Sequence, residues 1–319
     1  MTKDYAPILL FVYKRLEHVQ RVIDALRTNP EAADSILYIY SDAPASDADA
    51  EGVEAVREYV RSISGFEKVI VVERETNFGI EKSEVDGVTT VIGRHGKVIV
   101  LEDDIQVGNQ FLKYMNYCLN EYEGDKSIYT VTGYSFLKAD KANEELFGLT
   151  RSFCAWGWGT WSDRWENLSR SLNKSDIRYV ATHKSMLDNG QEFSYLLLHQ
   201  YKNRYLTWDV AWYYSCCKNG GMTIFPYNSL INNIGMDGSG VHYNDGSKEN
   251  RVEPINDRGE ISFPLKFGKF EDTLRKVVAE KKAGDKKTIL RQFKMIVRFW
   301  LNTIEILASG ADRVEIKRG

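Results

Sequence analysis

Three consecutive carboxylates, Glu102, Asp103 and Asp104, directly follow an apolar run at residues 98–101. At the end of a half-buried strand this acidic triplet would suffer mutual repulsion and lost hydration. A divalent cation removes that penalty, and hard oxygen ligands favour Mg²⁺ or Mn²⁺ with positions left for water and phosphate oxygens. The alternative is that Asp103 or Asp104 caps the helix that follows. The abrupt end of the apolar run favours a metal that bridges a diphosphate.

Polar residues also follow the three preceding apolar runs. They are Tyr13-Lys14-Arg15, Ser41-Asp42 and Asn77-Phe78-Gly79. Because ligands bind outside the carboxyl ends of the strands in an open α/β sheet, we expect all four clusters to share one ligand site. The sequence has no Gly-x-x-x-x-Gly-Lys-Ser/Thr loop, and no Gly-x-Gly-x-x-Gly at the first strand–helix junction. The metal, rather than a glycine-rich loop, would therefore neutralise the phosphates.

The elements that must position these residues alternate between strand and helix patterns. Short apolar runs lie at residues 7–12, 36–40, 69–72 and 98–101. Between them apolar residues recur at helical spacing, as with Val85, Val88 and Ile92. This order predicts an α/β fold with an open, mostly parallel, Rossmann-like sheet and helices on both faces.

Beyond Asp104 the pattern changes. The sequence predicts a helix at 111–122, a strand at 128–132, a loop rich in glycine and aromatic residues at 153–165, a short strand at 222–226 and a helical tail at 276–308.

Together these motifs resemble the nucleotide-sugar glycosyltransferases of the GT-A fold. The resemblance is to the branch that contains bacterial family 2 sugar transferases and eukaryotic N-acetylglucosaminyltransferase I, and it covers about residues 6–245. It implies a GT-A catalytic domain over residues 1–250, with a nucleotide-binding half at 1–104 and an acceptor half at 105–250. Residues 251–319 would form a helical carboxyl-terminal extension.

The resemblance also implies which residues contact the donor. Arg15 would lie near the nucleobase, and Asp42 would contact the uracil of a UDP-linked sugar. Asn77 and Lys82 would line the donor pocket.

The acidic triplet is similar to the family's Asp-x-Asp-type motif. By this resemblance Asp104 is the direct ligand of Mn²⁺ or Mg²⁺, Asp103 holds the ribose or the water shell of the metal, and Glu102 touches the sugar. His242, in the sequence Gly238-Ser-Gly-Val-His242, is a further candidate metal ligand, since neutral imidazole suits Mn²⁺. The alternative is a solvated loop histidine.

A tryptophan-rich stretch and a later Trp-Asp pair complete the resemblance. Trp156, Trp158 and Trp161 would lie in a flexible loop at the acceptor site, where their rings would stack on sugar, and Trp208 would also belong to the acceptor site. A buried aromatic corner is the competing interpretation.

Asp209 is the candidate catalytic base. Inverting transfer needs one carboxylate to take the proton of the acceptor hydroxyl. Asp163 is the substitute candidate, and an ordinary surface or capping role is the alternative for Asp209.

Residues 286–307 have an amphipathic helical pattern. Ile289, Phe293, Ile296, Trp300, Ile304 and Leu307 fall within roughly 80° of a helical wheel. Lysine and arginine residues fall on the opposite side. Peripheral contact of Lys286–Leu307 with a membrane surface and packing against the catalytic domain both fit this pattern.

Composition limits the function classes. The chain has 319 residues and a formal net charge of −3, which excludes a general nucleic-acid binder. No apolar run reaches the length of a membrane span. We expect a cytoplasmic enzyme that transfers a sugar from a nucleotide donor to a saccharide or lipid-linked saccharide in bacterial surface polysaccharide synthesis. A peripheral position at the inner face of the plasma membrane is the alternative location. The alternatives are a sugar nucleotidyltransferase and a non-catalytic sugar-binding module.

Overall fold

A mixed β-sheet forms the centre of the protein. The computed structural model describes residues 4–138, 145–183, 191–237, 260–283, 288–308 and 313–315. Within these residues the sheet has nine strands in the order β12-β7-β10-β6-β8-β4-β1-β2-β3. Their bounds are β1 Ile8–Val12, β2 Ile36–Ser41, β3 Lys68–Glu73, β4 Lys97–Glu102, β6 Ile128–Thr132, β7 Leu146–Thr150, β8 Trp158–Trp161, β10 Met222–Pro226 and β12 Lys266–Phe267.

The half of the sheet that contains β4, β1, β2 and β3 is entirely parallel. Its four strands coincide with the four apolar runs, so the predicted α/β class with a mostly parallel sheet is confirmed. In the other half, β8 runs antiparallel to both β4 and β6, and β7 runs antiparallel to β10. The prediction of a loop throughout 153–165 is therefore wrong, because Trp158–Trp161 is an inner strand.

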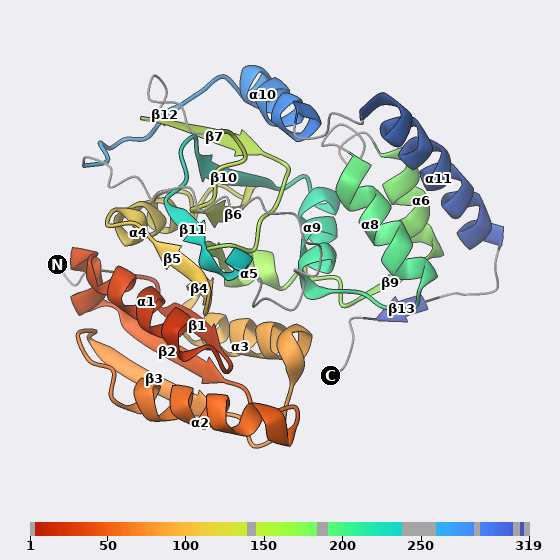
Figure 1. The fold of residues 1–319 in the computed structure, drawn as a ribbon. Helices are drawn as coiled ribbons and strands as arrows, with labels where there is room; N and C mark the ends of the chain where they lie inside the picture. The colour runs from red at the N-terminus through yellow and green to blue at the C-terminus, as the bar shows by residue number, and fades with distance from the viewer. Residues whose placement is uncertain are drawn as a thin grey trace.

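Helices cover both faces of the sheet (Figure 1). Along β1 the side chains of Ile8, Leu10 and Val12 pack into the core that contains α1, α2 and α4, whereas Leu9 and Phe11 pack into the core that contains α3 and α9. This alternation is the period of two that a strand imposes. It explains why all five residues of the strand are buried and apolar. The helices are α1 Leu16–Arg27, α2 Asp47–Arg61, α3 Gly79–His95, α4 Phe111–Glu121 and α9 Trp208–Lys218.

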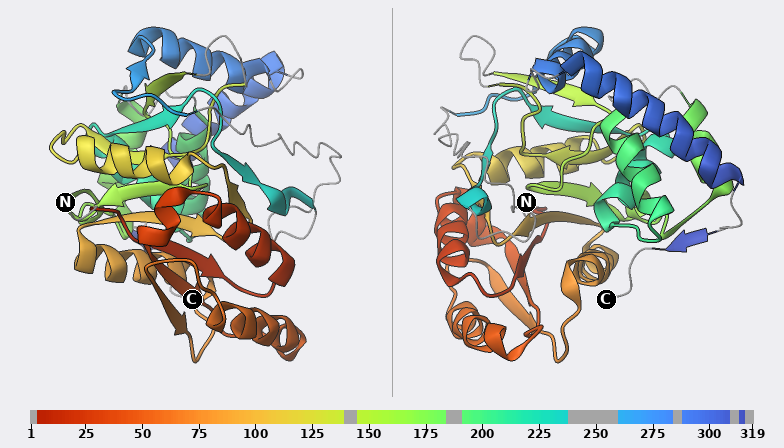
Figure 2. Two further views of the ribbon diagram at one scale, coloured as in Figure 1. Left: turned by 90° about the vertical axis from the view of Figure 1, so that its left-hand side faces the viewer. Right: turned by 45° about the vertical axis from the view of Figure 1, so that its right-hand side comes forward.

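A helical group lies beside the sheet, at the right in Figure 1 and in the right-hand view of Figure 2. It contains α6 Lys174–Thr182, α8 Gln191–Lys202 and α11 Thr288–Ala308. The helix α11 packs on α6 and α8, and α10 (Phe270–Ala283) packs on β7. These two helices fit the predicted helical tail. The same region also contributes β12, which pairs with β7, so it completes the sheet as well.

Shorter elements complete the chain. They are η1 Pro30–Asp34, β5 Ile105–Val107, α5 Ser162–Trp165, β9 Ser171–Asn173, β11 Ile231–Asn233, η3 Ile234–Asp237 and β13 Arg313–Glu315. The strand β5 pairs with β11, and β9 pairs with β13.

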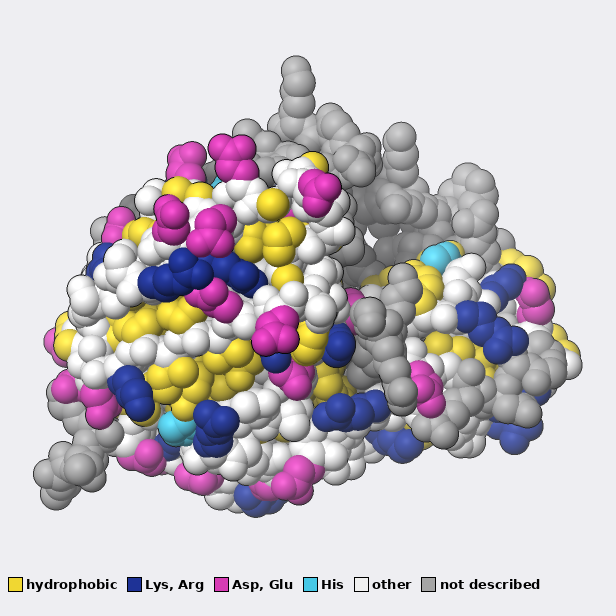
Figure 3. All heavy atoms as spheres, turned by 90° about the horizontal axis from the view of Figure 1, so that it is seen from below, with side chains coloured by type: hydrophobic (Ala, Val, Ile, Leu, Met, Phe, Trp, Pro, Cys, Tyr) yellow, Lys and Arg dark blue, Asp and Glu magenta, His cyan; other side chains and the backbone are white. Residues whose placement is uncertain are grey.

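The surface carries charges of both signs. Seen from the side of α2 and β3, acidic, basic and hydrophobic side chains are interspersed (Figure 3). Within the described ranges, no helix combines the length and the apolar composition that crossing a bilayer requires.

Candidate active site

The ends of four parallel strands place the candidate residues along one edge of the sheet. Because β4, β1, β2 and β3 are parallel, their carboxyl ends meet at the same edge, where Arg15, Asp42 and the acidic triplet follow their strands. Two further carboxylates lie close enough to interact with this edge. Asp209 on α9 raises the pKa of Glu102, and both Asp209 and Glu102 raise the pKa of Glu84 on α3. We call Arg15, Glu84, Glu102, Asp103, Asp104 and Asp209 the carboxyl-edge cluster.

Arg15 bridges two members of the acidic triplet. Its Nη2 donates to Asp103 Oδ1 and, at 2.8 Å, to Asp104 Oδ2, while its Nε donates to Asp103 Oδ2 at 3.4 Å. The three side chains are 20%, 8% and 13% exposed. Burial lowers the pKa of Arg15, but the contacts with both aspartates outweigh it and raise that pKa above its ordinary value. In this structure Arg15 thus balances the charge of the two aspartates. The family resemblance had instead placed Arg15 near the nucleobase of the donor.

The third member of the triplet, Glu102, is neutralised by a proton rather than by an ion pair. Burial and, to a smaller extent, the negative charges of Asp104, Asp103 and Asp209 raise its pKa to about 8, although Arg15 acts in the opposite direction. At neutral pH this carboxyl therefore keeps its proton. The repulsion that suggested a metal from the sequence is relieved here by one guanidinium and one proton.

Asp104 retains one oxygen that suits a cation. Its Oδ1 is buried and has no hydrogen-bond partner, and a carboxylate oxygen is a ligand that Mg²⁺ and Mn²⁺ prefer. Among the described residues, no three His, Cys, Asp or Glu side chains are arranged to hold a metal ion. His242 lies outside the described residues. The donor set therefore fits an ion held by Asp104 and by oxygens of a bound phosphate, rather than a closed protein site.

The segment β11–η3 lies directly against Asp104. The amide of Ile234 donates to the carbonyl of Asp104 at 2.9 Å. A Cβ on Gly235 would overlap Asp104 Oδ2 and lie 3.0 Å from Arg15 Nη1. Only glycine therefore allows the backbone to approach this ion pair so closely. Sequence reasoning missed Gly235, which comes just before the glycine-rich stretch 238–242.

Asp42 holds the beginning of α3. Its Oδ1 accepts from the amides of Ala43 and Phe78 at 2.9 and 2.8 Å, and its Oδ2 accepts from the amide of Gly79 at 2.8 Å. Asn77 Nδ2 donates to the carbonyl of Ala43 at 2.6 Å. In this structure both side chains tie the end of β2 to the helix, which is the capping role that a strand-end aspartate often has.

Lys82 lies over an aromatic ring beside this cap. Its Nζ is 3.6 Å from the centroid of Phe78, and the guanidinium of Arg74 is 4.3 Å from the same centroid. Two cations thus share one ring at the carboxyl ends of β2 and β3. Arg74 is also paired with the carboxylate of Asp86, so its charge is balanced in part.

Asp209 lies in the first turn of α9 and is half-buried. The preceding residue, Trp208, donates its amide to Glu81 Oε2 at 2.5 Å, so α3 and α9 are joined at this point. Because the charge of Asp209 raises the pKa of both Glu84 and Glu102, the structure brings it to the end of β4. The packing of α9 on α3 thus brings Asp209 close to Glu102, although the two residues lie far apart in the sequence.

Glu84 was missed by the sequence analysis. It is fully buried, and neither carboxylate oxygen has a hydrogen-bond partner. Burial raises its pKa well above the ordinary value, and the charges of Glu102, Glu81 and Asp209 add to the effect. Its place was visible in the sequence as a charged residue in the apolar stripe of α3, in line with Val88 and Val91.

Three of the four candidate tryptophans belong to the core, which corrects the expectation that they stack on sugar. Trp158, Trp161 and Trp208 are 0%, 1% and 4% exposed, and Trp158 stacks on Trp208 with centroids 5.5 Å apart. Gly159 lets β8 approach β4, since a Cβ there would lie 2.8 Å from the carbonyl oxygen of Val98. The glycines thus serve close packing rather than loop movement. Trp156 is partly exposed and packs edge-on against Tyr134.

Asp163 lies at the other edge of the sheet. Because β8 is antiparallel to β4, Trp158 pairs with Val100 and Trp161 pairs with Lys97, so the residues after β8 are at the amino end of β4. Asp163 accepts from Lys126 at 2.6 Å and from Arg164 at 2.7 Å. It is therefore ruled out as the substitute base for the carboxyl-edge cluster.

Comparison with known proteins gives partial structural likenesses. No protein-family model matches the chain, and no curated protein matches it. The mannosyltransferase PcManGT from Pyrobaculum calidifontis, in complex with GDP-Man and Mn²⁺, aligns with 13% identity and a TM-score of 0.37 over 52% of this chain and 47% of that chain. S. aureus TarS 1–349 aligns with 8% identity and a TM-score of 0.39 over 70% of this chain and 59% of that chain. The chain thus covers about half of each of these structures.

Proposed function

We propose that the protein is an inverting, metal-dependent glycosyltransferase of the GT-A type. It takes a sugar from a nucleoside diphosphate donor, UDP-linked in the first instance, and passes it to a saccharide or lipid-linked saccharide. Bacterial surface polysaccharide synthesis at the cytoplasmic face of the membrane is the setting we propose. The observation that carries the proposal is the carboxyl-edge cluster, in which a basic residue and five carboxyl groups converge at the ends of parallel strands.

The charge balance of the cluster suits a diphosphate. Arg15 Nη1 is buried without a hydrogen-bond partner, and Asp104 Oδ1 is in the same state. A phosphate oxygen would satisfy the first, and a cation bound to phosphate would satisfy the second. When bound, Mn²⁺ or Mg²⁺ would stabilise the negative charge of the leaving diphosphate.

The remaining roles follow from position. Asp209 would accept the proton of the acceptor hydroxyl as its oxygen attacks the anomeric carbon. Glu102, which is protonated at neutral pH, would donate a hydrogen bond to a sugar hydroxyl. Lys82 would provide positive charge along the donor pocket, with Asn77 and Asp42 fixing the backbone that forms it.

A donor screen tests this function. Purified protein is incubated with a panel of UDP-, GDP- and other nucleotide sugars, with Mn²⁺, with Mg²⁺ and with EDTA, and the released nucleotide is identified. We expect one donor to yield free nucleoside diphosphate in the presence of the metal, and EDTA to abolish the release. Release of pyrophosphate would instead indicate a sugar nucleotidyltransferase. Sugar binding that ignores both EDTA and nucleotide would indicate a binding module.

The base assignment has its own test. Asp209→Asn is expected to lower turnover on the order of a hundredfold while donor binding persists, because the carboxylate acts in proton transfer. Asp163→Asn is expected to retain turnover, since that residue lies at the opposite edge of the sheet. The reverse pattern would show that the base has been misassigned.

A further inference from the structure

The outer side of α11 carries a row of exposed apolar side chains. Val297, Trp300, Leu301 and Ile304 are 40%, 45%, 59% and 64% exposed. Their spacing of three and four residues puts them on one side of the helix. Among the large apolar side chains that the structure describes, Ile80 is the only other one so exposed. We call these four residues the outer row.

The outer row is not what attaches α11 to the protein. Phe299, Thr303 and Ile306 are buried, and the helix packs on α6 and α8. The sequence pattern places Trp300, Ile304 and Leu307 on one apolar face, but in the structure Leu307 packs against the core whereas Trp300 and Ile304 are exposed. A helix that is apolar on two sides is normally covered on both, so the outer row is suited to a second apolar partner.

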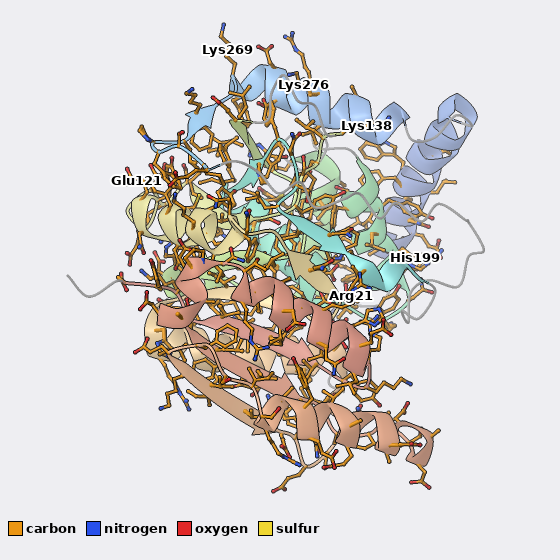
Figure 4. The ribbon with its side chains drawn as sticks, turned by 60° about the vertical axis from the view of Figure 1, so that its left-hand side comes forward. Arg21, Glu121, Lys138, His199, Lys269 and Lys276 are labelled. Atoms are coloured by element: carbon orange, nitrogen blue, oxygen red, sulfur yellow. The ribbon has the colours of Figure 1, made fainter. Side chains whose placement is uncertain are left out.

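The sequence that precedes and overlaps the outer row is basic, and this indicates the kind of partner. Residues 275–298 contain nine lysines and arginines and two acidic residues, in a chain whose net charge is −3. Arg275 and Lys276 are exposed on α10. Lys138, Lys269 and Lys276 lie along the side of the molecule where α10 runs (Figure 4). A strongly basic segment that adjoins an apolar row in the sequence is complementary to an anionic surface.

We propose that the outer row docks on an anionic lipid bilayer. The apolar side chains would enter the boundary between headgroups and acyl chains, with the indole of Trp300 at the headgroup level, and the basic segment would attract the anionic lipids. A second copy of the chain is the competing occupant of this row, and the test below separates the two. This surface is separate from the carboxyl-edge cluster, so the proposal stands or falls independently of the sugar-transfer activity.

Vesicle flotation tests the proposal directly. The full chain is mixed with vesicles of phosphatidylcholine alone or with added phosphatidylglycerol. We expect binding to the anionic vesicles, reduced by high salt. The double variant Leu301→Ser/Ile304→Ser should bind roughly tenfold more weakly, or worse, because each side chain loses apolar burial. The charge variant Arg275→Glu should also bind more weakly.

The controls separate docking from folding and from self-association. Ile80→Ser removes an exposed apolar side chain from α3 and should leave vesicle binding unchanged. All variants should keep the melting temperature of the wild type, since the altered side chains are exposed. Undiminished binding by the double variant, or equal binding to neutral vesicles, would overturn the proposal. It would also be overturned by a wild-type dimer in analytical ultracentrifugation that the double variant abolishes while neither protein binds vesicles.

Discussion

At the scale of single residues, Arg15 controls the stability of the carboxyl-edge cluster. Replacing it with alanine leaves Asp103 and Asp104 buried without their partner. We expect Arg15→Ala to lower the free energy of unfolding by about 3 kcal/mol in urea titrations. Arg61→Ala is the matched control, because it breaks an exposed pair with Glu73, and it should cost much less. If both variants lost the same free energy of unfolding, the ion pairs of Arg15 would contribute no more than an exposed surface pair.

Metal binding provides a second readout for the same residue. If a cation binds at Asp104, it should compensate for the missing guanidinium. Mn²⁺ is therefore expected to raise the melting temperature of Arg15→Ala by more than that of the wild type. An equal shift in both proteins would contradict a metal site at Asp104.

Glu84 makes stability depend on pH. Its pKa in the folded protein is raised by burial and by neighbouring carboxylates, so above its ordinary pKa of 4.5 the folded state holds a proton that the unfolded state has lost. The free energy of unfolding should then fall as pH rises above about 5. Glu84→Gln should flatten this slope, whereas an unchanged slope would show that Glu84 is not protonated in the fold. Urea titrations at several pH values measure it.

At the scale of elements, the beginning of α3 depends on Asp42. Asp42→Ala removes the acceptor of three backbone amides, so we expect a loss of about 1–2 kcal/mol in unfolding free energy and faster hydrogen exchange at Phe78 and Gly79. Ser46→Ala is the control, since that side chain occupies the N-cap of α2 without a capping hydrogen bond. Unchanged stability together with lost nucleotide binding would restore the direct role in base recognition.

The approach of η3 to the acidic triplet is equally specific. In Gly235→Ala the added methyl group overlaps Asp104, so we expect turnover to fall on the order of tenfold or more. Gly93→Ala is the control, because a Cβ at that helical position meets nothing within 4 Å. Turnover of Gly235→Ala equal to the wild type would mean that η3 moves away from Asp104 during the reaction.

The sequence predicted the elements that have a strong local signal. The strands β1 to β4 were found because strands buried on both faces read as unbroken apolar runs. The strand β8 was missed because its alternating Trp and Gly residues resemble a loop, although Gly159 is there to let β8 pack on β4. Local patterns therefore predict a helix or strand well only where its residues have a high intrinsic preference for that structure.

The site was predicted in part for the same reason. The acidic triplet and Asp209 stand in recognisable local motifs. Glu84 and Gly235 come to the triplet through the packing of α3 and η3, which no local motif records. The role of Arg15 could not be foreseen either, because its pairing with Asp103 joins residues from two different strand ends.

At the scale of the whole molecule, charged residues gather at the carboxyl edge of a parallel half-sheet, and the outer row of the helical side faces away from the core. The central claim concerns the first of these. It states that Asp104 holds a divalent cation together with the diphosphate of a nucleotide sugar.

The most direct measurement compares metal-dependent release of nucleoside diphosphate by the wild type, by Asp104→Asn and by Asp272→Asn, which alters an exposed aspartate on α10. The account predicts that Asp104→Asn loses about a hundredfold or more in turnover, as loss of a metal contact does, while Asp272→Asn keeps the wild-type rate. Normal, metal-dependent turnover by Asp104→Asn would contradict it.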